Sequence, residues 1–444
     1  MKVYKIITVL IVLILFSVTI KAQDKFSLKE AINYAKEHNR NIIISQKDIE
    51  IALKRKWETT AEGLPQINAN ATYNYWLKQQ LSLIPGVVAQ QPDKDFVPIA
   101  FGTKHNANGT ITIKQKVFDG SYLVALQSAK VFLEISKNQK EKSLTKIKEQ
   151  VTLAFVNVLV AKKATAITNQ NINNLKKNLY ETKEMLLNGL VEEENVEQLE
   201  ITLGELQNNL ISIEYQKEVA KDLLKVLIGK DINTSIQLTD NLEYLLSEYT
   251  SNTLNNSEIG LNNNIDFRIA QNKVKAKELQ LKLEKSKALP SLDVSFQTAI
   301  AGYGNNLNAT LRTTDMLTSN LFLVNLNIPI FSSFKRSAST KRKKIEVFQA
   351  KTALKETQQQ LSLKLTQAKK AFDLAIKKLS TTKQNLDLSE RIADKNQTKF
   401  NNGIASSFEL RQAQTQLYAT QQAYIQAIQT LISKKIELES LVNK

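Results

Sequence analysis

Apolar and small residues recur at alternating steps of three and four along two long stretches of the chain, residues 121–229 and 332–441. This spacing keeps one side of a helix buried against its neighbours, as in a coiled coil. In each stretch an Asn-Gly pair, Asn188-Gly189 or Asn402-Gly403, interrupts the pattern, which then resumes. The pattern therefore predicts two long helical hairpins, each reversing direction at its glycine.

The two stretches match each other when one is shifted by about 214 residues. They share the register of apolar positions on both sides of the glycine, which indicates an internal duplication. The longer arm of each stretch runs roughly 65 residues without Gly or Pro, equivalent to about 100 Å of α-helix. The sequence predicts a duplicated unit of long helical hairpins. Taken alone, these stretches also fit an ordinary long coiled coil.

Four segments ahead of the helical stretches alternate strictly between apolar and polar residues, which is the period of a β-strand. They make two predicted β-hairpins, residues 66–118 and 291–331, and the first includes a polar loop with Pro85, Pro92 and Pro98. A helix precedes each hairpin. The first begins at the capping box Ser27-Leu28-Lys29-Glu30 and is expected to run to about Ala61. The second is expected over residues 265–287.

Each predicted strand has about 10 to 12 residues with one apolar face, which is the length and pattern of a transmembrane β-strand. A half-buried strand of a soluble sandwich has a similar pattern, but here only two hairpins occur and long helices flank both. Four strands do not close a barrel, because membrane barrels need at least eight and open edges are not tolerated in lipid. The sequence therefore predicts an oligomer.

The first residues have the pattern of a secretory signal peptide. Lys2 and Lys5 precede an apolar run over residues 6–20, and Lys21-Ala22-Gln23 follows. A retained anchor helix is the alternative. The predicted organisation is a signal peptide 1–22; a first repeat 23–230 with its long helical hairpin at 120–229; a connector 231–264; and a second repeat 265–444 with its long helical hairpin at 335–442.

Composition narrows the possible functions. The formal charge of +17 comes from 60 Lys and Arg interleaved with 43 Asp and Glu, so we expect solvated helix surfaces and no nucleic-acid partner. The chain has no Cys and only two His, which excludes disulfides and thiolate sites and argues against histidine metal clusters. No phosphate-binding loop or catalytic constellation is present. We expect neither a cofactor, nor a metal, nor an enzyme.

Seven short motifs follow one another in the order of the predicted helices and strands. They are Phe26-Ser27-Leu28-Lys29-Glu30-Ala31-Ile32, Leu64-Pro65-Gln66-Ile67, Gln115-Lys116-Val117-Phe118-Asp119-Gly120, Asn188-Gly189-Leu190-Val191, Leu289-Pro290-Ser291-Leu292, Ile328-Pro329-Ile330-Phe331 and Phe400-Asn401-Asn402-Gly403. Each motif is weak alone, but their order, spacing and duplication resemble the TolC family of outer-membrane efflux proteins over essentially the whole mature chain. Two features depart from the family: Asn39-Arg40-Asn41-Ile42 lacks the proline often found there, and no cysteine is available for a lipid anchor.

The resemblance implies a mainly α-helical fold with a membrane β-barrel portion. It also implies a homotrimer, in which twelve strands form an outer-membrane barrel and twelve helices form a periplasmic tunnel. We therefore expect a passive export channel of a tripartite efflux or type I secretion system, in the bacterial outer membrane and extending into the periplasm. Its expected partners are a periplasmic adaptor protein, an inner-membrane transporter and outer-membrane lipid. The alternative from another class is a secreted structural coiled-coil surface protein.

The resemblance also assigns roles to residues. The two hairpin turns match the tips that meet the adaptor, namely Asn188, Gly189, Leu190, Val191, Asn402, Gly403, Ile404 and Ala405. In the family, acidic residues just beyond the second turn constrict the channel, and Glu409 and Gln412 occupy those positions here. The cations clustered in residues 335–344 would lie just below the membrane, near phospholipid headgroups. A solvated helix face is the alternative for this cluster.

Overall fold

The structure, a computed structural model, describes residues 24–251, 261–312 and 316–442. The predicted signal peptide, residues 1–22, lies outside these residues. The chain divides into two compact units. We call Met1–Lys47, Asn138–Ile269 and Lys355–Lys444 the helical unit, and Asp48–Lys137 and Ala270–Leu354 the sheet unit. Each unit therefore combines segments from both halves of the sequence.

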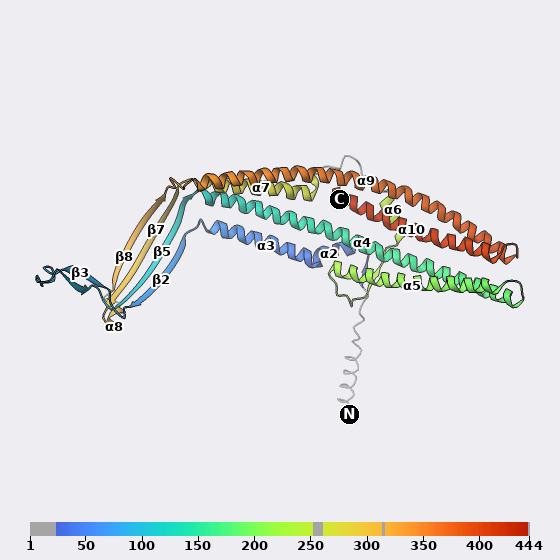
Figure 1. Cartoon of the computed structure of the whole chain (residues 1–444), viewed down its shortest axis with the longest axis horizontal. Helices are drawn as coiled ribbons and strands as arrows, with labels where there is room; N and C mark the ends of the chain where they lie inside the picture. The colour runs from blue at the N-terminus through green and yellow to red at the C-terminus, as the bar shows by residue number, and fades with distance from the viewer. Residues whose placement is uncertain (1–23, 252–260, 313–315, 443–444) are drawn as a thin grey trace, which may run out of the picture. The chain divides into compact units, whose positions relative to one another are not determined.

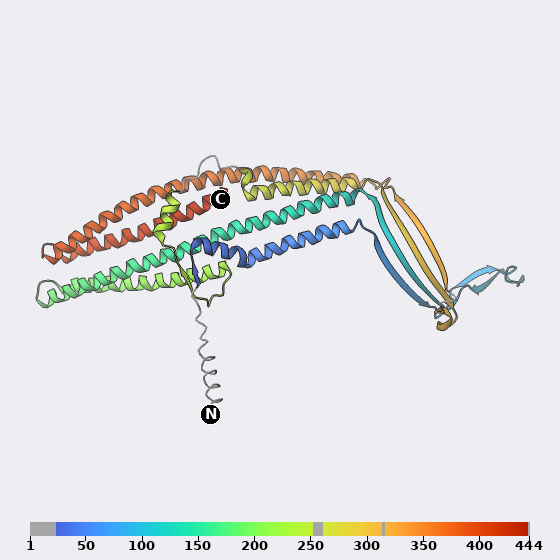
Figure 2. The ribbon, with the colours of Figure 1, turned by 180° about the vertical axis from the view of Figure 1, so that it is seen from behind.

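Four long helices form two antiparallel hairpins. In the first, α4 (Gly120–Leu187) is followed by α5 (Glu193–Ile228), and in the second, α9 (Lys335–Asn401) is followed by α10 (Ser407–Val442). Within the helical unit the two arms of each hairpin lie side by side (Figures 1 and 2). These hairpins confirm the mainly helical fold that the apolar spacing predicts.

A buried cluster in the helical unit joins elements from both hairpins. Val151 and Phe155 of α4, Leu224 of α5 and Ile432 of α10 are all completely buried in it. By length and composition, α4 is the one helix among the described residues that is apolar enough to cross a membrane, but half of its most apolar window is buried in the protein. Because Val151 and Phe155 lie in this cluster, that part of α4 is a core helix.

The prediction of one continuous helix from Ser27 to about Ala61 is wrong at Asn39. The structure has two helices, α2 (Leu28–His38) and α3 (Arg40–Ala61), with Asn39 between them in an extended conformation. The Asn39 Oδ1 accepts a hydrogen bond from the Asn41 backbone N–H (2.9 Å), as an N-cap residue does. The predicted capping box at Ser27 and Glu30 is present.

The sheet unit contains a four-stranded antiparallel sheet in the order β2-β5-β7-β8 (Figure 1). The strands are β2 (Gln66–Tyr75), β5 (His105–Asp119), β7 (Ser291–Gly304) and β8 (Leu317–Asn327). β2 pairs with β5, and β7 pairs with β8, each pair coming from one half of the sequence. The pairing of β5 with β7 joins the halves in the middle of the sheet. Among the described residues, the outer edges of β2 and β8 have no strand partner.

Two details of the strands differ from the prediction. The expected polar loop within residues 66–118 contains a two-stranded ladder, β3 (Leu81–Pro85) with β4 (Phe96–Ala100). Proline is tolerated there because each strand of an isolated pair has an edge that needs no N–H donor. The second predicted hairpin extends to residue 331, but its last strand, β8, begins at Leu317 and ends at Asn327. Pro329 lacks the N–H that a longer strand would need.

The remaining elements are short, except for α7 (Ile265–Ser286), which precedes β7. β1 (Asp24–Phe26) pairs in parallel with β6 (Ile236–Leu238). The predicted connector, residues 231–264, contains β6, α6 (Leu242–Ser251) and a 3₁₀ turn, η2 (Leu261–Asn263), and is only partly described. A single-turn helix, α8 (Leu307–Thr310), lies between β7 and β8.

Candidate functional site: hairpin tips and an amide-lined cavity

The first hairpin turns through a Schellman motif. The Gly189 N–H donates to the Leu186 carbonyl (2.9 Å), and the Leu190 N–H donates to the Met185 carbonyl (2.9 Å). This pattern requires a left-handed residue at the end of the helix, and Gly189 has a φ of 71°. A Cβ added to Gly189 would meet nothing within 4 Å. The glycine is therefore needed for its backbone conformation and not for space.

The second hairpin repeats this turn. The Gly403 N–H donates to the Phe400 carbonyl (2.9 Å), the Ile404 N–H donates to the Lys399 carbonyl (2.8 Å), and Gly403 has a φ of 68°. The structure places both turns at the same end of the helical unit (Figures 1 and 2). Six of the eight predicted adaptor-binding residues are exposed, namely Asn188, Gly189, Leu190, Asn402, Gly403 and Ile404, whereas Val191 and Ala405 are half-buried.

The two turns differ in how the returning helix begins. α10 begins with a capping box, because the Ser406 N–H donates to the Glu409 Oε2 (2.8 Å) and the Glu409 N–H donates to the Ser406 Oγ (3.3 Å). α5 begins after Glu192, whose side chain makes no capping hydrogen bond. A direct contact joins the tips, since the Ser407 Oγ donates to the Asn195 Oδ1. Asn195 is six residues after its glycine, the position that Glu409 has in the second copy.

The predicted gate residues Glu409 and Gln412 are both exposed on the first turns of α10. Residues three apart lie on neighbouring positions of one helix face, so the structure brings the two side chains to the same side of α10. Hydrogen bonds from the Ser406 N–H and hydroxyl hold the pKa of Glu409 below its ordinary value. Glu409 is therefore a charged helix-capping residue, a role that sequence comparison with the family did not suggest.

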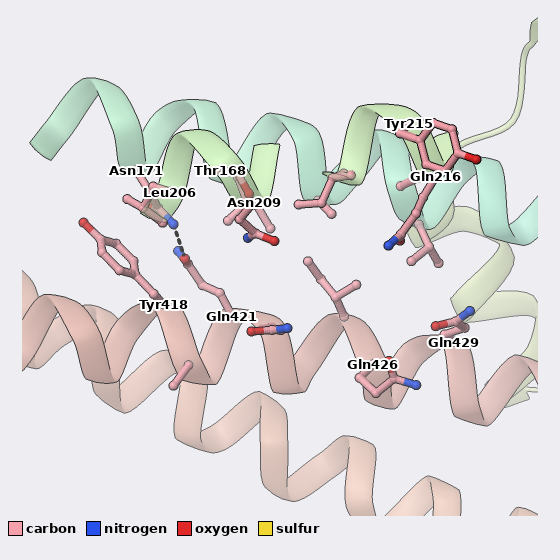
Figure 3. A pocket seen from close by; sticks show the side chains of 18 of the residues that line it. Thr168, Asn171, Leu206, Asn209, Tyr215, Gln216, Tyr418, Gln421, Gln426 and Gln429 are labelled. Atoms are coloured by element: carbon pink, nitrogen blue, oxygen red, sulfur yellow. Dashed lines mark hydrogen bonds between the residues drawn. The ribbon is translucent and has the colours of Figure 1, made fainter. Parts of the chain in front are cut away.

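A cavity of about 800 Å³ lies between α4, α5 and α10 in the helical unit (Figure 3). Its lining is rich in amide side chains, including Asn157, Asn171, Asn209, Gln216, Gln421, Gln422, Gln426 and Gln429. Two hydrogen bonds cross it: Asn171 Nδ2 donates to Gln421 Oε1 (2.7 Å), and Gln429 Nε2 donates to Asn157 Oδ1 (3.0 Å). These bonds tie the first hairpin to the second.

The side chains that line this cavity carry almost no charge. Glu205 is the one charged residue in its lining, and burial raises the pKa of Tyr418 to about 12, so this phenol stays protonated. Amides donate and accept hydrogen bonds without a net charge. The sequence carried a signal for this cavity, the run of glutamines along α10, but the partners on α4 and α5 were not predictable from spacing.

The described residues contain no group of three or more His, Asp or Glu side chains that could hold a metal ion.

Comparison with known proteins decides the family. Residues 258–444 match the family model described as outer membrane efflux protein. This part of the chain is an outer membrane efflux protein domain. The resemblance that the sequence motifs predict is thereby confirmed, and with it the outer-membrane location. A search of curated proteins finds no match.

Solved structures show that the similarity in fold extends beyond the matched residues. The structure of VceC, an outer membrane protein from Vibrio cholerae, has a TM-score of 0.75 at 14% identity and covers 94% of this chain and 95% of its own. CusC has a TM-score of 0.74 at 14% identity, covering 94% of this chain and 92% of its own. The MtrE outer membrane channel of Neisseria gonorrhoeae has a TM-score of 0.73 at 15% identity, covering 94% and 88%. At these identities the likeness establishes the fold alone.

Proposed function

We propose that this outer membrane efflux protein is a homotrimer that forms a passive channel through the outer membrane and periplasm. The observation that carries the proposal is the four-stranded sheet with two open edges. Every residue of the edge strands β2 and β8 is exposed in the single chain. Open edges in lipid leave backbone groups without partners. Pairing of β8 in one copy with β2 in the next satisfies both edges, and three copies give a closed ring of twelve strands.

An exposed apolar row across the sheet supports its insertion in lipid. The strand register aligns Ile67 with Ile113, Ile113 with Phe296, and Phe296 with Phe322. All four side chains are exposed in the single chain. The next row faces the other way and is more polar, with Asn68, Thr112 and Gln297 in register and the apolar Leu321 at its end on β8. One face of the sheet is therefore suited to lipid and the other to water.

The oligomeric state and channel activity are tested together. In mild detergent, size-exclusion chromatography with light scattering should give the mass of three chains, and a gel should show an assembly that only heating dissociates. The same material should conduct ions in a planar bilayer. A stable monomer that retains its β content would overturn the proposal, because a single chain leaves both sheet edges open.

We further propose that the hairpin tips bind the periplasmic adaptor of a tripartite efflux or type I secretion system. The exposed apolar side chains of Leu190 and Ile404, at 73% and 74% exposure, support this role, because exposed apolar groups at a rigid tip favour a protein partner. The cysteine-free chain allows a direct test. Leu190→Cys and Ile404→Cys should cross-link to the adaptor, whereas Tyr215→Cys, exposed in the middle of α5, should not. Equal cross-linking at all three positions would contradict the assignment.

A further inference from the structure

The strongest concentration of positive charge in the sheet unit lies where α9 begins. Residues 335–344 contain six cations and no acid. The ten equivalent residues of the first copy, 121–130, at the start of α4, contain a single cation, Lys130. The duplication therefore provides an internal comparison. A long helix begins after a membrane strand in both copies, but only the second copy places a basic segment there.

Helix stability does not account for these charges. Cations in the first turns of a helix oppose its macrodipole, and cations three or four residues apart repel each other. Two carboxylates lie within reach. Glu284 of α7 pairs with Lys287 (2.9 Å) and lies near Arg342. Glu346 pairs with cations of both helices. Its oxygens contact Lys343 (2.9 Å), Lys277 of α7 (2.9 Å) and Arg342 (3.5 Å). Hydrogen bonds from Lys343 and Lys277 lower the pKa of Glu346 to about 2. The Glu346 carboxylate thus pairs with three cations.

Arg336 donates to the Pro329 and Ile330 carbonyls, which leaves Lys335, Lys341 and Lys344 of the six. Together with Lys285 of α7, these exposed lysines form what we call the basic patch. The structure records no side-chain partner for them among the residues it describes. Lys285 belongs to α7, which lies antiparallel to α9, as the contacts Lys277–Glu346 (2.9 Å) and Gln280–Lys343 (3.5 Å) show (Figure 1). This register places the last turn of α7 level with the first turns of α9.

Exposed aromatic side chains lie directly before the patch. Phe331 and Phe334 are 75% and 76% exposed and contact each other edge to face, with ring centroids 5.9 Å apart, a geometry that aromatic pairs prefer. Ser333 and Phe334 have φ values of 47° and 62°, which are unfavourable for residues other than glycine. The backbone thus holds two rings in solvent beside four lysines. Aromatic rings next to cations are the composition of a membrane–water interface.

We propose that the basic patch binds the anionic headgroups of phospholipids in the periplasmic leaflet, while Phe331 and Phe334 enter the interface of that leaflet. The proposal rests on the proposed function only in that the sheet lies in the membrane. α7 ends shortly before β7, and α9 begins shortly after β8, so both helix ends leave the membrane at the same surface. Headgroup phosphates then supply the negative charge that the protein lacks there.

Native mass spectrometry of the full-length assembly tests this idea. The assembly is equilibrated with equal amounts of phosphatidylglycerol and phosphatidylcholine before the lipids that remain bound are counted. The parent should prefer phosphatidylglycerol, and salt raised from about 0.1 M to 1 M should weaken the preference through screening. Each lysine near an anionic surface contributes on the order of fivefold. The variant with Lys285, Lys335, Lys341 and Lys344 all changed to Gln should lose at least about tenfold of the preference.

The matched control removes the same charge elsewhere on α9. Its exposed lysines Lys364, Lys370, Lys377 and Lys378 are changed to Gln, and the preference should remain. Equal losses in both variants, or no loss in the patch variant, would overturn the proposal. Displacement of the lipid by inorganic phosphate alone would also overturn it, because the patch would then bind a soluble anion.

The aromatic pair has its own test. Phe331→Ser with Phe334→Ser should lower retention of both lipids alike, because the rings contact acyl chains and not headgroup charge. If this variant instead dissociates the trimer, the rings contact a neighbouring copy and their role at the interface is wrong. Conductance in planar bilayers is measured on the same preparations. A conducting trimer without lipid preference refutes only the lipid site, whereas a non-conducting monomer refutes the proposed function.

Discussion

Asn39 and Asn264 make the same pair of hydrogen bonds in the two halves of the chain. The Asn39 Nδ2 donates to the Leu227 carbonyl (2.7 Å), and the Asn264 Nδ2 donates to the Leu441 carbonyl (2.9 Å). Each Oδ1 accepts from the backbone N–H two residues later, at 2.9 Å in both cases. Each buried asparagine thus begins one helix and closes the end of another. The duplication preserves a structural tie as well as an apolar pattern.

We expect Asn39→Ala to lower the free energy of unfolding by about 1–2 kcal/mol, because it removes an N-cap and leaves the Leu227 carbonyl without its donor. Urea unfolding of the detergent-solubilised protein measures the change. Asn41→Ala is the control, because Asn41 is exposed and takes part in the tie only through its backbone N–H. Equal destabilisation by both changes would show that the two Asn39 side-chain hydrogen bonds contribute little to stability. Asn264→Ala should behave as Asn39→Ala does.

Gly403→Val should strain the second turn by about 1–2 kcal/mol, because the φ of 68° is unfavourable for a residue with a Cβ. Adaptor binding in a pull-down should weaken more than trimer assembly. Gly204→Ala in α5 is the control: nothing lies within 4 Å of an added Cβ, and alanine favours the helix by up to about 1 kcal/mol. Normal export and adaptor binding by Gly403→Val, at normal protein levels, would show that the tip assignment is wrong.

Glu409→Gln should change cation block and its pH dependence in single-channel recordings if three copies bring this carboxylate to the channel axis. The pKa of Glu409 is lowered in the folded state. Its capping contribution is therefore complete at neutral pH and is lost as the pH falls below about 4.5, its ordinary value, through the lowered pKa.

Ser406→Ala separates the two roles of Glu409. It removes the cap, at a cost of about 1 kcal/mol, but keeps the carboxylate. We therefore expect Ser406→Ala to lower stability while leaving cation block close to that of the parent. If Glu409→Gln also leaves cation block and its pH response unchanged, Glu409 is a capping residue and does not line a constriction.

Phe322→Lys should destabilise the membrane-inserted sheet by about 2–4 kcal/mol, because it places a charge on the face proposed to contact lipid. Gln297→Lys is the control, since its row points to the opposite face. The folded fraction is measured by gel shift after refolding into liposomes. If Gln297→Lys proves the more harmful change, the faces are assigned the wrong way round.

Local sequence patterns sufficed to predict the elements that have strong local signals. The heptad spacing, the turn glycines Gly189 and Gly403, and the alternating strands are each encoded within a few residues. The break at Asn39 was missed because residues 36–41 contain neither Gly nor Pro, and the asparagine acts by a bond to Leu227, far away in sequence. The ladder of β3 and β4 was not predicted because Pro85 and Pro98 are typical of loops.

Contacts between segments that are distant in sequence could not be predicted from the periodicity of apolar residues. The pairing of β5 with β7 and the amide bond between Asn171 and Gln421 depend on how two hairpins meet, which no single pattern reports. The capping role of Glu409 was visible in the spacing Ser406-Ser407-Phe408-Glu409, which is a capping-box sequence. The family resemblance drew attention to a gate instead. The adaptor, gate and trimer assignments stay predictions.

The central pairing of β5 with β7 constrains the order in which the segments of the chain fold. Asp119 must find Ser291, and the whole first helical hairpin and the connector separate these residues in the sequence. Loop closure over so long a segment is slow. During export across the inner membrane, β2 and β5 therefore emerge well before β7 exists, with one edge of β5 open and able to aggregate. The open edge of β5 is consequently a site where the nascent chain can aggregate until its second half arrives.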